Sequence, residues 1–237
     1  MASTNLAERL AFTLTELLVV IVVIAILVAI LLSVTASVLE SGYRTKCINN
    51  QRQLMVGVIA YANDHDGLLP YPNWRNEVPG WLYTPPNAAT DQDLQAGQIW
   101  TYVKTPGVYR CPLDRPSTEQ LQQRFVKICS YCMNGAVCGY GRLAPPASPY
   151  NLPNTYPISR FSGTAVCFWE QDEGSDGYWF NDASNEPDEA ITKRHKGGAI
   201  ISCFDGHVEW MTWDEYNAQK DISPGRFWCN PGINNGH

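Results

Sequence analysis

The sequence predicts an α+β protein in which one long N-terminal helix packs on a small antiparallel sheet with long loops. Three observations lead to this fold class. Residues 17–32 form a continuous apolar run of helical length, and an amphipathic segment follows it to about residue 66. Beyond Pro70, short apolar runs alternate with stretches rich in Pro and Gly, which is typical of short strands joined by loops.

The apolar run is long enough to cross a membrane. Residues 17–32 are sixteen consecutive apolar positions without Pro or Gly. As a helix they cover ~24 Å, and the uncharged residues 33–39 extend them to a full bilayer crossing. The core of a signal peptide is usually shorter, about 7–15 residues, and ends at a small-residue cleavage site. We therefore expect a transmembrane helix over residues 12–39 rather than a signal peptide.

The residues just before this run form a specific pattern. Ala11 is followed by Phe12, then by Thr-Leu-Thr and Glu16, and then by the apolar helix. The pattern resembles the cleavage and methylation motif of type IV prepilins and type II secretion pseudopilins, which more often have Gly before the cut. The resemblance implies a leader of residues 1–11, cleavage between Ala11 and Phe12 by prepilin peptidase, and N-methylation of Phe12.

Glu16 has an implied role in assembly. A carboxylate at the head of a membrane span costs free energy and normally serves a function. The resemblance implies that Glu16, the fifth residue of the mature chain, pairs with the free amine of a neighbouring subunit in a filament. The alternative is a glutamate that lies at the membrane interface by chance.

Two signals disagree about the side of the membrane. Arg44, Lys46 and Arg52 follow the span and only Arg9 precedes it, which by the positive-inside rule would put the C-terminal part in the cytoplasm. The cleavage motif and the number of cysteines favour the opposite side. We therefore expect a single-pass protein of the inner (cytoplasmic) membrane with its C-terminal domain in the periplasm or at the cell surface.

Residues 40–66 are predicted to continue the helix as an amphipathic stalk. Apolar residues recur there at helical spacing: Cys47, Leu54, Val58 and Tyr61. The helix should end near residues 63–67, because Gly67 is a suitable C-cap and Pro70 bars continuation.

The remaining residues, 67–237, are expected to form an extracytoplasmic globular domain. Candidate strands are residues 108–111, 165–170, 199–204 and 207–211. Asp205 and Gly206 lie between the last two and are a two-residue hairpin signal. Residues 70–98 and 140–160 are predicted to be long surface loops.

Short stretches extend the resemblance to one branch of pseudopilin-like proteins. One runs from Cys47 (Cys-Ile-Asn-Asn-Gln-Arg-Gln-Leu), and another is Tyr-Arg-Cys-Pro around Cys111. His195, with Asp205 and Gly206, gives the H-x9-D-G spacing of that branch. Each stretch is weak alone, and their order along the chain makes the set more specific.

The chain has eight cysteines: 47, 111, 129, 132, 138, 167, 203 and 229. An even number in an exported domain favours disulfides. The C-x2-C pair of Cys129 and Cys132, with Cys138 nearby, would suit zinc, but a second C-x2-C or a His pair does not accompany it. We favour disulfides or free structural thiols over a metal, and we predict a Cys47–Cys111 bridge between the stalk and the segment ending at Pro112.

Three further groups of residues are candidate sites. His195 and His207 could face one another with Asp205 as a metal or acid–base group, although turn-stabilising roles are favoured. The acidic residues in 172–182 could bind calcium, although a solvated loop is favoured. The aromatic residues in 178–180, with Trp169, Trp210 and Trp213, could stack on a sugar or a partner, although core packing is favoured.

The sequence favours a structural protein over an enzyme. The net charge of −6 gives no nucleic-acid footprint, and the sequence lacks a nucleophile elbow, an H-E-x-x-H motif and a phosphate-binding loop. We expect no cofactor and no metal. The resemblance implies a structural subunit of a type II secretion pseudopilus or related type IV pilus-like filament. Its expected partners are prepilin peptidase, other pilin-like subunits, the secretion or pilus assembly platform and the membrane. The alternative is a membrane-anchored extracytoplasmic module that binds glycan or another polymer.

Overall fold

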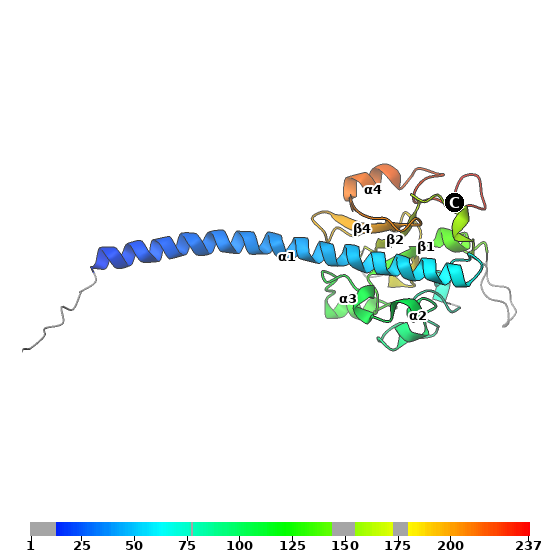
Figure 1. The fold of residues 1–237 in the computed structure, drawn as a ribbon, viewed down its shortest axis with the longest axis horizontal. Coiled ribbons are helices and arrows are strands. Elements are labelled where there is room, and N and C mark those ends of the chain that lie inside the picture. Colours follow the sequence, from blue (N-terminus) through cyan, green and yellow to red (C-terminus); the bar gives the residue numbers. More distant parts are fainter. Residues whose placement is uncertain (1–12, 77, 144–154, 173–179) are drawn as a thin grey trace, which may run out of the picture. The chain divides into compact units, whose positions relative to one another are not determined.

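A computed structural model describes residues 13–76, 78–143, 155–172 and 180–237 and divides the chain into two compact units, residues 1–42 and 43–237. The helix α1, Leu14–Asp64, begins in the first unit and ends in the second (Figure 1). The expected continuous helix of span and stalk is therefore present.

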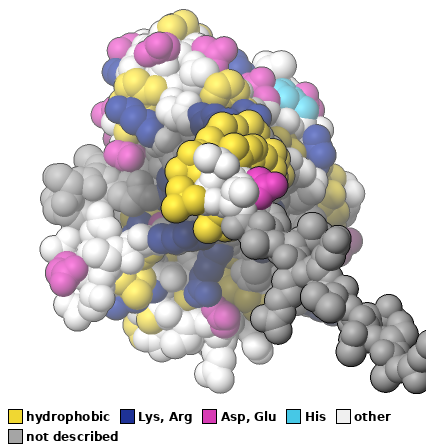
Figure 2. Space-filling view, turned by 90° about the vertical axis from the view of Figure 1, so that its left-hand side faces the viewer, with side chains coloured by type: hydrophobic (Ala, Val, Ile, Leu, Met, Phe, Trp, Pro, Cys, Tyr) yellow, Lys and Arg dark blue, Asp and Glu magenta, His cyan; other side chains and the backbone are white. Residues whose placement is uncertain are grey.

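The first unit contains an apolar helical segment, Leu14–Leu32, with a mean hydropathy of 3.2. Its large hydrophobic side chains are 45% to 81% exposed, and Figure 2 shows hydrophobic side chains around the visible end of α1. A helix that is apolar on all sides needs an apolar environment. Among the described residues, this one helix is long and apolar enough to span a membrane.

In the second unit, the remainder of α1 is amphipathic and forms part of the core. Leu54 and Val58 are fully buried, and Gln51 Nε2 donates a hydrogen bond of 2.7 Å to the carbonyl of Ile200 in the sheet. The helix ends where it was expected, because Gly67 has φ +82° and its N–H donates to the carbonyl of Ala62 at 2.8 Å.

The second unit contains a five-stranded sheet in the order β3-β1-β2-β4-β5. The strands are β1 Tyr131–Asn134, β2 Val166–Glu170, β3 Ser184–Asn185, β4 Gly198–Cys203 and β5 Val208–Thr212. Three neighbouring pairs are antiparallel, but β1 and β3 are parallel. The expected antiparallel pairing is therefore present in most of the sheet, but the parallel pair β1–β3 makes the sheet mixed.

Three of the four candidate strands are present in the structure. β2, β4 and β5 lie within one residue of the candidate strands 165–170, 199–204 and 207–211. The candidate strand 108–111 is wrong, because Pro106–Tyr109 forms a 3-10 helix, η3. Backbone groups of Arg110 and Cys111 form hydrogen bonds with side chains rather than with a neighbouring strand. The Arg110 carbonyl accepts from Asn50 Nδ2 at 2.9 Å, and Cys111 N–H donates to Ser130 Oγ at 3.0 Å.

The β4–β5 hairpin has a longer turn than predicted. Cys203 N–H donates to the carbonyl of His207, and Gly206 N–H donates to the carbonyl of Cys203. Three residues therefore separate the bonded pair, with Gly206 at φ +88°. This is the three-residue hairpin pattern in which a left-handed residue follows the turn.

Short helices complete the unit. They are α2 Trp100–Val103, α3 Thr118–Gln123 and α4 Trp213–Gln219, with 3-10 turns η1 Trp74–Asn76, η2 Asp93–Ala96, η4 Gly135–Cys138 and η5 Ile158–Arg160. Both α3 and α4 begin with a capping box, formed by Ser117 with Gln120 and by Thr212 with Glu215.

The core lies on both faces of the sheet. One cluster joins α1, β1 and the segment after Pro70, and the other joins the opposite face to α4 and Phe227. Trp81, Leu82 and Tyr83 are fully buried in the first cluster. The predicted surface loop 70–98 is therefore only partly at the surface: Tyr71 and residues 81–83 are buried in the core, whereas residues 89–92 are exposed. Much of 140–160 lies outside the described residues.

Candidate functional site

The predicted cleavage residues, Ala11 and Phe12, lie outside the described residues. Glu16 is described, and it caps its own helix. Its carboxylate accepts hydrogen bonds from the N–H and the hydroxyl of Thr13 at 2.8 and 2.7 Å, and its N–H donates to the Thr13 hydroxyl at 3.3 Å. This capping box satisfies free backbone donors at the start of α1, which is a structural role beyond the assembly role expected for Glu16.

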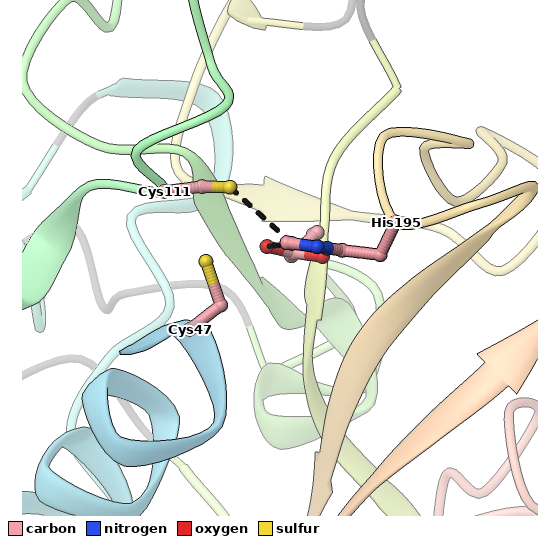
Figure 3. Close-up of side chains that lie close together, drawn as sticks. Cys47, Cys111 and His195 are labelled. Carbon is pink, nitrogen blue, oxygen red and sulfur yellow. Dashed lines mark hydrogen bonds and ion pairs between the residues drawn. The ribbon is translucent and has the colours of Figure 1, made fainter. Parts of the chain in front are cut away.

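Cys47, Cys111, Glu170 and His195 converge in the core of the second unit. One ligand-type atom from each residue lies within 4.8 Å of all the others, and Figure 3 shows Cys47, Cys111 and His195 pointing toward one another from separate segments. Cys47 comes from α1, Cys111 follows η3, Glu170 ends β2 and His195 precedes β4. We call these four residues the Cys-His-Glu cluster.

Two distances define the centre of this cluster. His195 Nε2 lies 3.1 Å from Glu170 Oε1 and 3.4 Å from Cys111 Sγ. Cys47, Glu170 and His195 are fully buried and Cys111 is 2% exposed. The sulphur atoms of Cys47 and Cys111 lie within 4.8 Å of one another and both residues are free thiols here. The predicted proximity is present, and the disulfide stays a prediction.

The close contacts shift the protonation equilibria of the cluster. A hydrogen bond with Cys47 and then one with His195 lower the pKa of Cys111 to about 7, whereas the bond to Cys111 raises the pKa of Cys47. Burial opposes the imidazolium, but its hydrogen bonds with Cys111 and with the Glu170 carboxylate raise the pKa of His195 to about 9. Burial also opposes the Glu170 carboxylate, but His195 outweighs it and lowers the Glu170 pKa.

Backbone contacts hold the cluster residues in position. Glu170 Oε2 accepts from Ile200 N–H at 2.8 Å. The turn after His195 is closed by its N–H, which donates to the carbonyl of Gly198 at 3.0 Å. Gly198 has no room for a Cβ, because the Met211 carbonyl oxygen occupies that space. The His-Lys-Gly-Gly sequence thus fixes His195 at the edge of β4.

A second charged group lies beside the cluster. Asp114 makes a bidentate ion pair with Arg124 at 3.0 Å, accepts from Ser130 Oγ at 2.6 Å and lies 3.8 Å from Arg194, the residue before His195. Ser130 in turn accepts from the N–H of Cys111. Asp114 therefore connects the segment that carries Cys111 to the loop that carries His195.

The Cys-His-Glu cluster does not have the geometry of a nucleophilic triad. Such a triad uses one imidazole nitrogen for the nucleophile and the other for the orienting acid, whereas Cys111 and Glu170 both contact Nε2 of His195. The burial of all four side chains also leaves little surface for a substrate. Two thiols, an imidazole and a carboxylate at these separations are, however, suitable ligands for a metal ion.

The residues of the H-x9-D-G motif lie in two separate places. His195 is in the cluster at the start of β4, whereas Asp205 and Gly206 form the turn at its end. Asp205 Oδ1 accepts from His207 Nδ1 at 2.6 Å, and both side chains are at least 40% exposed. His195 and His207 therefore lie at opposite ends of β4 and do not face one another.

The other candidate groups have structural roles among the described residues. Cys129 and Cys132 belong to the two different core clusters, on opposite faces of the sheet. Asp182 accepts from the N–H groups of Arg75 and Ser184, and residues 173–179 of the acidic loop lie outside the described residues. Trp169 and Phe180 are buried in the core, as favoured.

A second possible metal-binding group, Cys203, His207 and Glu209, is weaker. Arg226 donates to both Glu209 Oε1 and Cys203 Sγ. A guanidinium thus already supplies the positive charge at this position, and the group is partly exposed.

Sequence reasoning found Cys47, Cys111 and His195 but missed their association with Glu170. The available signal was a carboxylate at the end of an otherwise apolar candidate strand, which is unusual for a buried position. Comparison with protein-family models, curated proteins and solved structures found no match.

Proposed function

We propose that the chain is a structural subunit of a type II secretion pseudopilus or a related type IV pilus-like filament, processed by prepilin peptidase. The observation that carries the proposal is the Ala11-Phe12 junction followed by Glu16 at the start of a helix that is apolar on every side. In the mature chain, the amine of Phe12 would pair with Glu16 of a neighbouring subunit. The globular unit would lie outside the cytoplasm.

Two structural features support this proposal. The side chains of Leu14–Leu32 remain exposed within the chain, so they are free to contact lipid or the same segment of other subunits. The same helix, α1, supplies buried residues to the core of the second unit.

The test is the mass of the mature N-terminus. The full-length chain is produced in membranes with and without a prepilin peptidase, and its N-terminal peptide is analysed by mass spectrometry. The expected product begins with N-methylated Phe12 only when the peptidase is present. Ala11→Gly, which restores the family's commoner residue, should be cleaved at least as well, whereas the bulky Ala11→Val should not. A mature chain that begins at Met1, or after a cut beyond the span, would contradict the proposal.

A further inference from the structure

The Cys-His-Glu cluster brings together four metal-ligand side chains from four segments that are distant in the sequence. Cys111 and His195 are 84 residues apart, and His195 and Glu170 are 25 residues apart. Around them lie apolar and aromatic residues of the core, such as Tyr131 and Ile200. Buried polar groups in such a setting normally need strong partners, because their desolvation is costly.

The geometry fits a small tetrahedral ion. Zinc bonds of ~2.3 Å to sulphur and ~2.0–2.1 Å to nitrogen or oxygen place the atoms of a tetrahedral ligand set about 3.3–3.8 Å apart. The measured separations from His195 Nε2 are 3.1 Å to Glu170 and 3.4 Å to Cys111, and all four atoms lie within 4.8 Å of one another. Small side-chain rotations would complete the tetrahedron.

The types of ligand atom in the cluster and their total charge also favour zinc. Thiolates and imidazole favour zinc over magnesium or calcium, which prefer oxygen ligands. Two thiolates and one carboxylate carry three negative charges, and a divalent cation offsets two of them. Two ligands also have position-fixing contacts outside the cluster: Ile200 N–H donates to Glu170 Oε2 at 2.8 Å, and Cys111 N–H donates to Ser130 Oγ at 3.0 Å.

We propose that Cys47, Cys111, Glu170 and His195 bind a structural zinc ion that joins α1 to the sheet. All four coordination positions are protein side chains, as in structural rather than catalytic zinc sites. Binding displaces the protons of the two thiols and the Nε2 proton of the His195 imidazolium, and it forms two Zn–S, one Zn–N and one Zn–O bond with no change in oxidation state. The predicted Cys47–Cys111 disulfide would use the same sulphur atoms, so the two states exclude one another.

The first experiment measures zinc in the full-length chain. The protein is purified in detergent under reducing conditions, supplied with zinc, desalted and analysed by elemental mass spectrometry. We expect about one zinc per chain. Replacing zinc by Co²⁺ should give intense visible bands of tetrahedral coordination and near-ultraviolet bands of thiolate ligation. This readout uses the wild-type chain and does not depend on how any variant folds.

Variants then assign the ligands. Cys111→Ser should lose the bound zinc, and Glu170→Gln should weaken zinc binding by at least about tenfold, which is the lower end of the effect of removing an outer-shell partner. Cys129→Ser is the matched control, because Cys129 is a cysteine buried in the same core cluster but outside the Cys-His-Glu cluster. It should keep one zinc per chain.

Three results would overturn the inference. They are a reduced wild-type chain that binds no zinc, a Co²⁺ spectrum without thiolate bands, and equal zinc loss in Cys129→Ser and Cys111→Ser. Non-reducing peptide mapping of protein freshly isolated from membranes provides an independent check. If all of Cys47 and Cys111 were recovered in one disulfide-linked peptide, these residues would form a disulfide and not a zinc site. None of these results changes the mass of the mature N-terminus. Failure of the zinc site can therefore be distinguished from failure of the proposed filament function.

Discussion

At the residue scale, buried ion pairs join separate segments of the second unit. Arg124 and Asp114 have side chains only 3% and 7% exposed, and Arg194 is 6% exposed. Arg124 also lies over the ring of Phe180 at 3.6 Å. Buried charges of this kind are tolerated because each has an opposite charge and hydrogen bonds, and removing one partner leaves the others uncompensated.

Asp114→Asn tests this connection. We expect a loss of about 3–5 kcal/mol in the free energy of unfolding, because two buried guanidinium groups would lose their carboxylate. The measurement is chemical denaturation of the full-length chain in detergent. Asp91→Asn is the control, since the Arg110–Asp91 pair is 45% and 53% exposed and such pairs contribute about 0.2–1 kcal/mol. Equal effects of the two substitutions would contradict the role of Asp114.

The Asp114 carboxylate should also make the free energy of unfolding depend on pH. Burial alone would raise its pKa, but Arg194 and Arg124 outweigh burial and lower the pKa of Asp114. A group whose folded-state pKa is lowered stabilises the protein above its unfolded value of about 3.9, and this contribution disappears as the pH falls through the folded pKa. Wild-type stability should therefore fall more steeply below about pH 4 than that of Asp114→Asn.

At the element scale, the sequence predicted those elements whose signals are local. The apolar periodicity of α1, the Gly67 cap and the β4–β5 hairpin are all encoded within a few residues. β3 has only two residues, Ser184–Asn185, and its parallel pairing with β1 depends on tertiary contacts. The cluster was partly predictable: Cys47 and Cys111 were expected to meet, but the approach of Glu170 and His195 depends on the sheet order, which no local pattern specifies.

Glu16 is an element-scale test, because its carboxylate caps α1 and is also proposed to pair with another subunit. Glu16→Ala removes both roles, although the Thr13 hydroxyl can still accept from the backbone N–H of residue 16. Glu16→Gln keeps the capping box, which accepts Gln, but removes the charge. We expect both variants to insert in the membrane and neither to assemble, as measured by crosslinking subunits in membranes. Wild-type crosslinking of Glu16→Gln would show that the charge is not needed.

At the scale of the whole molecule, α1 is the element that the two units share. Its first part has exposed apolar side chains on all sides, whereas its second part has one buried face. Cys47 of the proposed zinc site, Gln51 and Leu54 all lie in this second part. The globular unit therefore needs the second part of α1 for its own core, and the stalk predicted over residues 40–66 belongs to this unit from Tyr43 onward.

Leu54→Ala measures this dependence. Leu54 is fully buried in the core cluster, so truncation leaves a cavity and should cost about 2–5 kcal/mol of unfolding free energy. Val56→Ala, two residues away on the same helix and 66% exposed, should change stability by no more than about 0.5 kcal/mol. Denaturation of the full-length chain in detergent, followed by the fluorescence of buried residues such as Trp81, reports the second unit. Because both variants leave Leu14–Leu32 unchanged, both should insert equally well, and a difference in stability alone assigns the effect to packing. If Leu54→Ala were as stable as Val56→Ala, the second part of α1 would not be the core element described here.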